Sequence, residues 1–139
     1  MKYASENCTE DEISRNTPLI IAAKFGHVEV VRVLLDGGAN AEMANVDQRT
    51  ALHLAAWYGY LEECHLLLDY GAKVDPVNKW KETPLHCAAL WGHLSVVQLL
   101  VERGADVTLK NTGGLTASDL ARSWESNTVA DWLDSVSRG

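Results

Sequence analysis

The chain has 139 residues and a formal net charge of −7 at pH 7, from 12 Lys and Arg against 19 Asp and Glu. This balance argues against a nucleic-acid-binding protein, because phosphate binding needs clustered Lys and Arg. No apolar run approaches the length of a membrane span, and the first residues lack the apolar stretch of a secretory signal. We therefore expect a cytoplasmic protein, with the nucleus as a second location.

The first predicted helix begins after Thr17, whose hydroxyl can accept hydrogen bonds from the free N–H groups of the first turn. It ends at Gly26, where glycine readily takes the left-handed conformation. A second apolar segment runs on to Gly38, which ends it in the same way. About a dozen residues then lead to Thr50, enough for an extended finger. The unit is thus helix, tight turn, helix and finger.

This order recurs in the following units with a 33-residue period, set by Thr17, Thr50, Thr83 and Thr116, although the fourth copy is weaker. Three further markers repeat in phase, and they are a turn glycine (Gly26, Gly59, Gly92), a Gly-Ala pair (Gly38-Ala39, Gly71-Ala72, Gly104-Ala105) and an alanine pair (Ala22-Ala23, Ala55-Ala56, Ala88-Ala89). The alanines have little bulk, so neighbouring helices can approach closely. One unit cannot bury its apolar face alone, whereas stacked units form a solenoid.

The period, the Thr-Pro-Leu-His motif at 83–86 and the Gly-Ala pairs resemble the ankyrin repeat family over about residues 12–133. The resemblance implies an all-α ankyrin-repeat solenoid of four stacked helix-turn-helix repeats with β-turn finger loops. It also implies a concave face that binds a partner protein. We expect an N-terminal polar segment at 1–11 and a repeat domain at 12–139, with repeats at about 12–44, 45–77 and 78–110 and a capping repeat at 111–139.

The two ends depart from the pattern in different ways. In the last unit Glu125 replaces the turn glycine, and Ser118, Asp119 and Ser126 replace apolar or aromatic residues, as a capping repeat requires. The first unit has Ile20 where the motif has His. Either the polar segment before it folds over this repeat or another repeat precedes it. We favour a repeat domain that begins with this unit and is imperfectly capped there.

One charged residue interrupts the apolar pattern of the second unit. Glu63 occupies the position that Val30 and Val96 hold in the sister units. We expect its side chain either at the outer edge of the stack or in a local pair with a Lys or Arg.

Aromatic side chains gather just before the turn glycines. One column reads Phe25, Tyr58, Trp91 and Trp124. On a helical wheel Tyr58 lies about 60° from the alanine stripe and Trp57 about 100°, so neither is needed to fill the stack. Trp57 is the stronger candidate for a contact residue. Tyr58 and Trp91 fit partner contact and packing on the next repeat equally well, whereas Trp124 and Trp132 fit packing in the last unit better.

The finger tips offer a second candidate surface. Trp80 stands between Lys79 and Lys81 in a predicted turn, and loops on a rigid scaffold often carry function. The residues that we expect to contact a partner protein are Phe25, Asp47, Arg49, Trp57, Tyr58, Lys79, Trp80, Leu90 and Trp91. Lys24 and Glu82 lie at their rim. Such a strip suits a partner with protruding apolar side chains, since aromatic residues are enriched at binding hot spots.

We find no pattern of catalytic, cofactor-binding or metal-binding residues. His53 and His86 belong to the repeat motif, where we expect them to join neighbouring loops by hydrogen bonds, as do His27 and His93 after the turn glycines. There is no Cys-x-x-Cys or His-x-x-x-His zinc pattern, no phosphate-binding loop with Gly-Lys and no serine elbow. The three cysteines are odd in number and widely spaced, so they form no disulfide framework.

Two classes of function remain. The first is a non-catalytic adaptor, scaffold or protein inhibitor that binds another protein through the concave face and the finger tips. The alternative is a structural or tethering ankyrin module within a larger multidomain protein. Neither class requires a cofactor.

Overall fold

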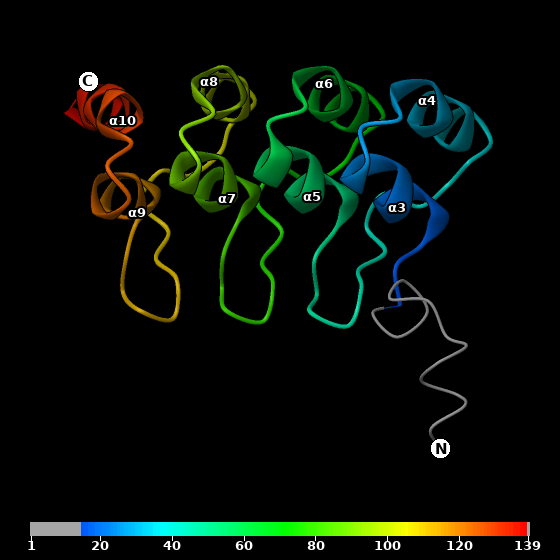
Figure 1. Ribbon diagram of the computed structural model, residues 1–139, viewed down its shortest axis with the longest axis horizontal. Helices are drawn as coiled ribbons and strands as arrows, with labels where there is room; N and C mark the ends of the chain where they lie inside the picture. Colours follow the sequence, from blue (N-terminus) through cyan, green and yellow to red (C-terminus); the bar gives the residue numbers. More distant parts are fainter. Residues whose placement is uncertain (1–14, 139) are drawn as a thin grey trace.

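A computed structural model describes residues 15–138, in which eight α-helices form four pairs standing side by side in a row (Figure 1). No strand occurs within this range. The helices are α3 (Pro18–Lys24), α4 (Val28–Asp36), α5 (Ala51–Tyr58), α6 (Leu61–Asp69), α7 (Pro84–Leu90), α8 (Leu94–Glu102), α9 (Ala117–Ser123) and α10 (Asn127–Arg138). The predicted all-α stack of helix-turn-helix repeats is confirmed. The polar segment predicted at 1–11 lies outside the described residues, and the repeat boundaries stay predictions.

The helices form two layers. An inner layer of α3, α5, α7 and α9 packs helix against helix along the row, and an outer layer of α4, α6, α8 and α10 lies beside it (Figure 1). Long finger loops join each outer helix to the next inner helix and project on the inner side. The alanines at the inner contacts have no exposed surface, namely Ala23, Ala55, Ala56, Ala88 and Ala89. Small side chains therefore set the close spacing of the stack.

Threonine caps and glycine turns fix the ends of the inner helices. Thr50 Oγ1 accepts a hydrogen bond from the His53 N–H (3.4 Å), and the Thr50 N–H donates to His53 Nδ1 (3.1 Å). After α5 the chain turns at Gly59, where φ is +77° and an added Cβ would lie 2.6 Å from His93 Nδ1. Only glycine fits this turn without moving its neighbour. Glu125 takes the equivalent turn in the last repeat with φ +63°.

The first repeat exposes a face that later repeats bury. Val30 and Val33 in α4 are 48% and 67% exposed, whereas Val96 and Leu99, at the same positions of α8, are 1% and 4% exposed. These positions therefore face the preceding repeat of the stack. A side chain at the Val30 position of the second, third or fourth repeat is enclosed between two outer helices.

Both expectations for Glu63 are wrong. Its side chain is only 3% exposed, and its Oε2 atom is buried without a hydrogen-bond partner. Burial, and then the nearby Glu62 carboxylate, raise the pKa of Glu63 to about 7. The reason is its position, since the sister residues Val96 and Val129 are each 1% exposed. A carboxyl group thus stands at an apolar contact between the first and second repeats.

Polar side chains cover the last pair of helices. Ser118 Oγ donates to Asp134 Oδ1 (2.6 Å), and Arg122 Nη2 donates to Asp134 Oδ2 (2.6 Å). Trp132 is half-buried against the core, as predicted. This network gives α9 and α10 the polar outer character expected from Ser118.

Candidate functional site

Each finger is built around an asparagine. Asn45 Oδ1 accepts hydrogen bonds from the N–H groups of Asp47 (3.0 Å) and Arg49 (2.9 Å). Asn78 and Asn111 do the same in the next two fingers. Sequence reasoning missed these residues, although their 33-residue spacing was a signal. The asparagines hold the fingers in one shape and thereby position the side chains at the tips.

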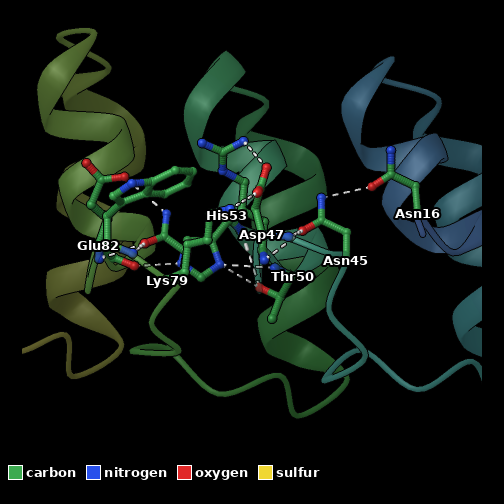
Figure 2. A network of polar contacts seen from close by, with 10 residues as sticks. Asn16, Asn45, Asp47, Thr50, His53, Lys79 and Glu82 are labelled. Carbon is green, nitrogen blue, oxygen red and sulfur yellow. Dashed lines mark hydrogen bonds and ion pairs between the residues drawn. The ribbon is translucent and has the colours of Figure 1, made fainter. Parts of the chain in front are cut away.

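Neighbouring fingers are joined through their backbones and through two buried histidines. The N–H of Lys79 donates to the carbonyl of Asp47 (3.1 Å). His53 Nε2 donates to the Glu82 carbonyl of the next finger (2.8 Å; Figure 2). His86 Nε2 donates to the Leu115 carbonyl in the same way (3.0 Å). The predicted role of both histidines in tying loops together is thus confirmed.

Burial keeps these two histidines neutral. It lowers the pKa of His53 to about 4 and lowers the pKa of His86 as well. His93 Nε2 also joins repeats, since it donates to the Trp57 carbonyl (3.0 Å). The same prediction is wrong for His27, which is exposed with its ring beside Phe25, at 6.4 Å between centroids. Its position faces the preceding repeat, as Val30 does.

Four predicted residues meet at the finger tips, and we call them the finger cluster: Asp47, Arg49, Lys79 and Trp80. The Arg49 guanidinium carbon lies 5.2 Å from the centre of the Trp80 ring, and Lys79 Nζ lies 5.0 Å from it. The Asp47 carboxylate forms ion pairs with both cations. Its oxygens lie 2.9 Å from Lys79 Nζ and 3.6 Å from Arg49 Nη1. Cation–π and ionic contacts together hold these side chains in place at the surface.

A row of three tryptophans follows the inner layer, and we call it the aromatic row: Trp57, Trp91 and Trp124. Trp57 and Trp91 meet edge to face, with centroids 5.4 Å apart and planes at 74°. The Trp91 and Trp124 rings are 6.0 Å apart. The packing role predicted for Trp124 is wrong, because it is 59% exposed. It follows the last residue of α9, so its ring extends over the surface toward Trp91 rather than into the core.

Arg49 connects the finger cluster to the aromatic row. Its guanidinium carbon is 5.9 Å from the Trp57 ring as well as close to Trp80. Trp57 is half-buried against the core, whereas Trp80 and Trp91 are exposed. Six of the nine predicted contact residues are therefore joined in one chain of contacts from Lys79 to Trp91.

The other three predicted residues lie beside this chain of contacts. Tyr58 is exposed and its ring stacks on Tyr60, at 5.7 Å and 22°. Phe25 is exposed near the first repeat, with Lys24 Nζ 5.3 Å from its ring. Leu90 is half-buried at the end of α7. None of these three contacts a residue of the finger cluster through an aromatic or ionic interaction among the residues described.

Two hollows adjoin at Trp57 and Tyr58, which line both. A polar hollow of about 280 Å³ is also lined by Lys24, Asp47 and Arg49. An aromatic hollow of about 410 Å³ is lined by Trp57, Tyr58, Trp91 and His93. Hollows of this size can receive single side chains of a bound molecule, and their linings differ in polarity.

Residues 15–138 contain no group of three or more His, Cys, Asp or Glu side chains placed to hold a metal ion. Burial raises the pKa of the Cys64 and Cys87 thiols to about 12, so neither supplies a thiolate near neutral pH. None of the described helices is long and apolar enough to cross a membrane.

Stacked helix pairs with capped helices and finger loops define a repeat solenoid. One face of this solenoid carries the finger cluster and the aromatic row. A family model described as ankyrin repeats (3 copies) matches residues 2–78, and a second, ankyrin repeats (many copies), matches residues 58–101. The chain belongs to the ankyrin repeat family. Ankyrin repeats are generally protein–protein interaction modules and are typically non-catalytic. No curated protein matches the chain.

Proposed function

We propose that the chain is a non-catalytic module that holds a partner protein through its inner-helix face and finger tips, as an adaptor, scaffold or inhibitor. The observation that carries this proposal is the continuity of the finger cluster with the aromatic row through Arg49. Large exposed aromatic side chains that lie together favour protein binding, because soluble proteins rarely expose contiguous apolar patches without a use for them.

Two members of the aromatic row, Trp91 and Trp124, are not needed to hold the stack together. The contacts between inner helices are made by alanines with no exposed surface, such as Ala55 and Ala88. Trp91 and Trp124 are 48% and 59% exposed on the surface above these contacts. Their burial by a partner would therefore release water from apolar surface that folding leaves exposed.

The test compares partner capture by the wild-type chain and by a Trp80→Ala/Trp91→Ala variant, with bound proteins identified by mass spectrometry. Trp57 stays in place because it is half-buried and its removal would disturb the core. Tyr70→Ala is the matched control, since Tyr70 is an exposed aromatic residue at the end of the outer helix α6. Far-UV circular dichroism melts establish that all three proteins are folded.

We expect a partner that the wild-type chain and the Tyr70 variant capture and the double variant loses. A partner that all three proteins retain equally would place the interface elsewhere, on the outer helices or on the exposed face of α4, and would overturn the proposed site.

A further inference from the structure

The finger cluster and its surroundings carry positive charge on a chain that is acidic as a whole. Among the described residues that line the polar hollow, Asp47 is the one carboxylate, and Lys79 and Arg49 both pair with it. Lys24 lines the same hollow, and Lys81 is exposed next to Trp80. The Glu82 side chain adds one further carboxylate, which accepts a hydrogen bond from Asn78 Nδ2 (3.0 Å). Among the residues that the structure describes, three cations of the fingers (Arg49, Lys79 and Lys81) thus stand against two carboxylates (Asp47 and Glu82), although the chain as a whole carries a net charge of −7.

The exposure of the paired groups favours a negative ligand as well. The Lys79 side chain is 48% exposed, and the Asp47 side chain between the two cations is 28% exposed. The Arg49 side chain, at 30%, is about as exposed as Asp47, so a partner meets Lys79 more readily than the carboxylate that pairs with it. Charged groups of opposite sign on a partner are attracted to such a surface, and those of the same sign are repelled.

The aromatic hollow has a different chemistry. Among the described residues its lining is Trp57, Tyr58, Trp91 and His93, which include no carboxylate. Aromatic rings can bind a cation on their faces, but Arg49 already lies 5.9 Å from the Trp57 ring and would repel a second positive charge. The hollow is therefore suited to an apolar side chain, which gains from burial against the rings.

We infer that this face binds an acidic chain segment that places a bulky apolar side chain in the aromatic hollow and a carboxylate beside Arg49 and Lys79. The inference rests on the proposed function and adds the chemistry of the partner. The two hollows share Trp57 and Tyr58, so neighbouring side chains of one segment reach both. Two hollows of side-chain size fit a segment rather than a flat protein surface.

The experiment begins with a phage-displayed library of random 12-residue peptides selected on the wild-type chain. We expect enriched peptides in which Asp or Glu lies within a few residues of Trp, Phe, Leu or Ile. One enriched peptide is then synthesised, and its dissociation constant is measured by fluorescence anisotropy for the wild-type chain, Arg49→Glu, Trp91→Ala and Arg32→Glu. Arg32→Glu is the matched control, because it makes the same charge change on the outer helix α4, where Arg32 is exposed.

We expect about tenfold weaker binding for Arg49→Glu and for Trp91→Ala, and a change under about twofold for Arg32→Glu. Raising the salt concentration should weaken wild-type binding, because exposed charges are screened. A peptide with Lys in place of its acidic residues should prefer the Arg49→Glu variant to the wild-type chain. Melting curves of each variant show that the differences arise in the folded state.

The outcomes separate this inference from the proposed function. Enriched peptides that are basic or neutral, and that still lose affinity in Trp91→Ala, would overturn the acidic segment and support the site. Peptides that bind Arg49→Glu and Trp91→Ala as tightly as the wild-type chain would overturn both. A selection without enrichment would overturn the segment, and the capture experiment with Trp80→Ala/Trp91→Ala would then judge the site alone.

Discussion

Replacing Glu63 by valine should stabilise the protein, and the gain should grow as the pH rises. Glu63 is 3% exposed at a position where Val96 and Val129 are each 1% exposed, and its Oε2 atom has no hydrogen-bond partner. A buried carboxylate without a partner is costly, so the folded protein favours the protonated form. Valine at this site restores the side chain that the sister repeats already accommodate.

The pKa gives the magnitude and the sign. Burial raises the pKa of Glu63 from 4.5 to about 7. At about 1.4 kcal/mol per pKa unit, this rise corresponds to at most about 3.5 kcal/mol of folding free energy. The folded protein binds this proton more tightly than the unfolded chain. The stability contributed by protonated Glu63 is therefore fully present below about pH 4.5. It is lost as the pH rises from about 4.5 through about 7.

The assay is urea unfolding followed by far-UV circular dichroism at pH 5 and pH 8, for the wild-type chain, Glu63→Val and Glu63→Gln. Both variants should exceed the wild-type unfolding free energy by about 2–3 kcal/mol more at pH 8 than at pH 5. Glu62→Gln, a change at the exposed neighbour, should alter stability by under about 0.5 kcal/mol. Comparing variants at each pH removes the contributions of other titrating groups, such as His53.

A Glu63→Gln gain that is equal at pH 5 and pH 8 would refute the reasoning, because the charge of Glu63 would then not be the cause. A loss of stability in Glu63→Val at pH 8 would also refute it, since that result requires a favourable partner for the carboxylate.

Two further predictions concern the contacts that join repeats. Gly59→Ala and Gly71→Ala both place alanine at positive φ, at a cost of about 1–2 kcal/mol. In urea unfolding, Gly59→Ala should lower the unfolding free energy by about 1–3 kcal/mol more than Gly71→Ala does. The added Cβ at position 59 would lie 2.6 Å from His93 Nδ1 and would disturb the hydrogen bond from His93 to the Trp57 carbonyl. A Cβ at position 71 would meet no atom within 4 Å. Equal losses would contradict that contact. His53→Ala should lower the unfolding free energy by roughly 2–4 kcal/mol at pH 7, since it removes a threonine cap contact and the bond to the Glu82 carbonyl. Because burial lowers the pKa of His53 from 6.5 to about 4, wild-type stability falls as the pH drops through this range, so thermal melts should show a smaller gap between wild type and variant at pH 4.5 than at pH 7.

The helices and turns were predictable because each depends on residues close in sequence. Thr50 caps a helix through the N–H three residues later, and Gly59 turns the chain with its own φ. The same caps and turns then recur in each repeat along the chain. The stack followed from the same pattern, since one helix pair cannot bury its apolar face alone and small residues such as Ala55 and Ala56, which have no exposed surface, let the next pair pack closely.

Glu63 shows what a single repeat does not reveal. A helical wheel gives the direction of a side chain relative to its own helix, but not which neighbour encloses it. That neighbour is the preceding repeat, as the contrast between exposed Val30 and buried Val96 shows. The expectation that Glu63 lies at an outer edge failed because the wheel of α6 contains no information on α4.

The candidate site likewise could not be predicted from single helices, because its contacts join residues about one repeat apart. His53 and the Glu82 carbonyl are 29 residues apart in sequence, and His93 and the Trp57 carbonyl are 36 apart. A residue of one repeat thus becomes part of the candidate binding surface only when the next repeat supplies a suitable contact. Arg49 illustrates this, since it stacks on Trp80 of the following finger and faces Trp57 of its own repeat. Aligning each repeat with its successor, rather than studying each helix alone, is therefore the step that brings a binding surface out of a solenoid sequence.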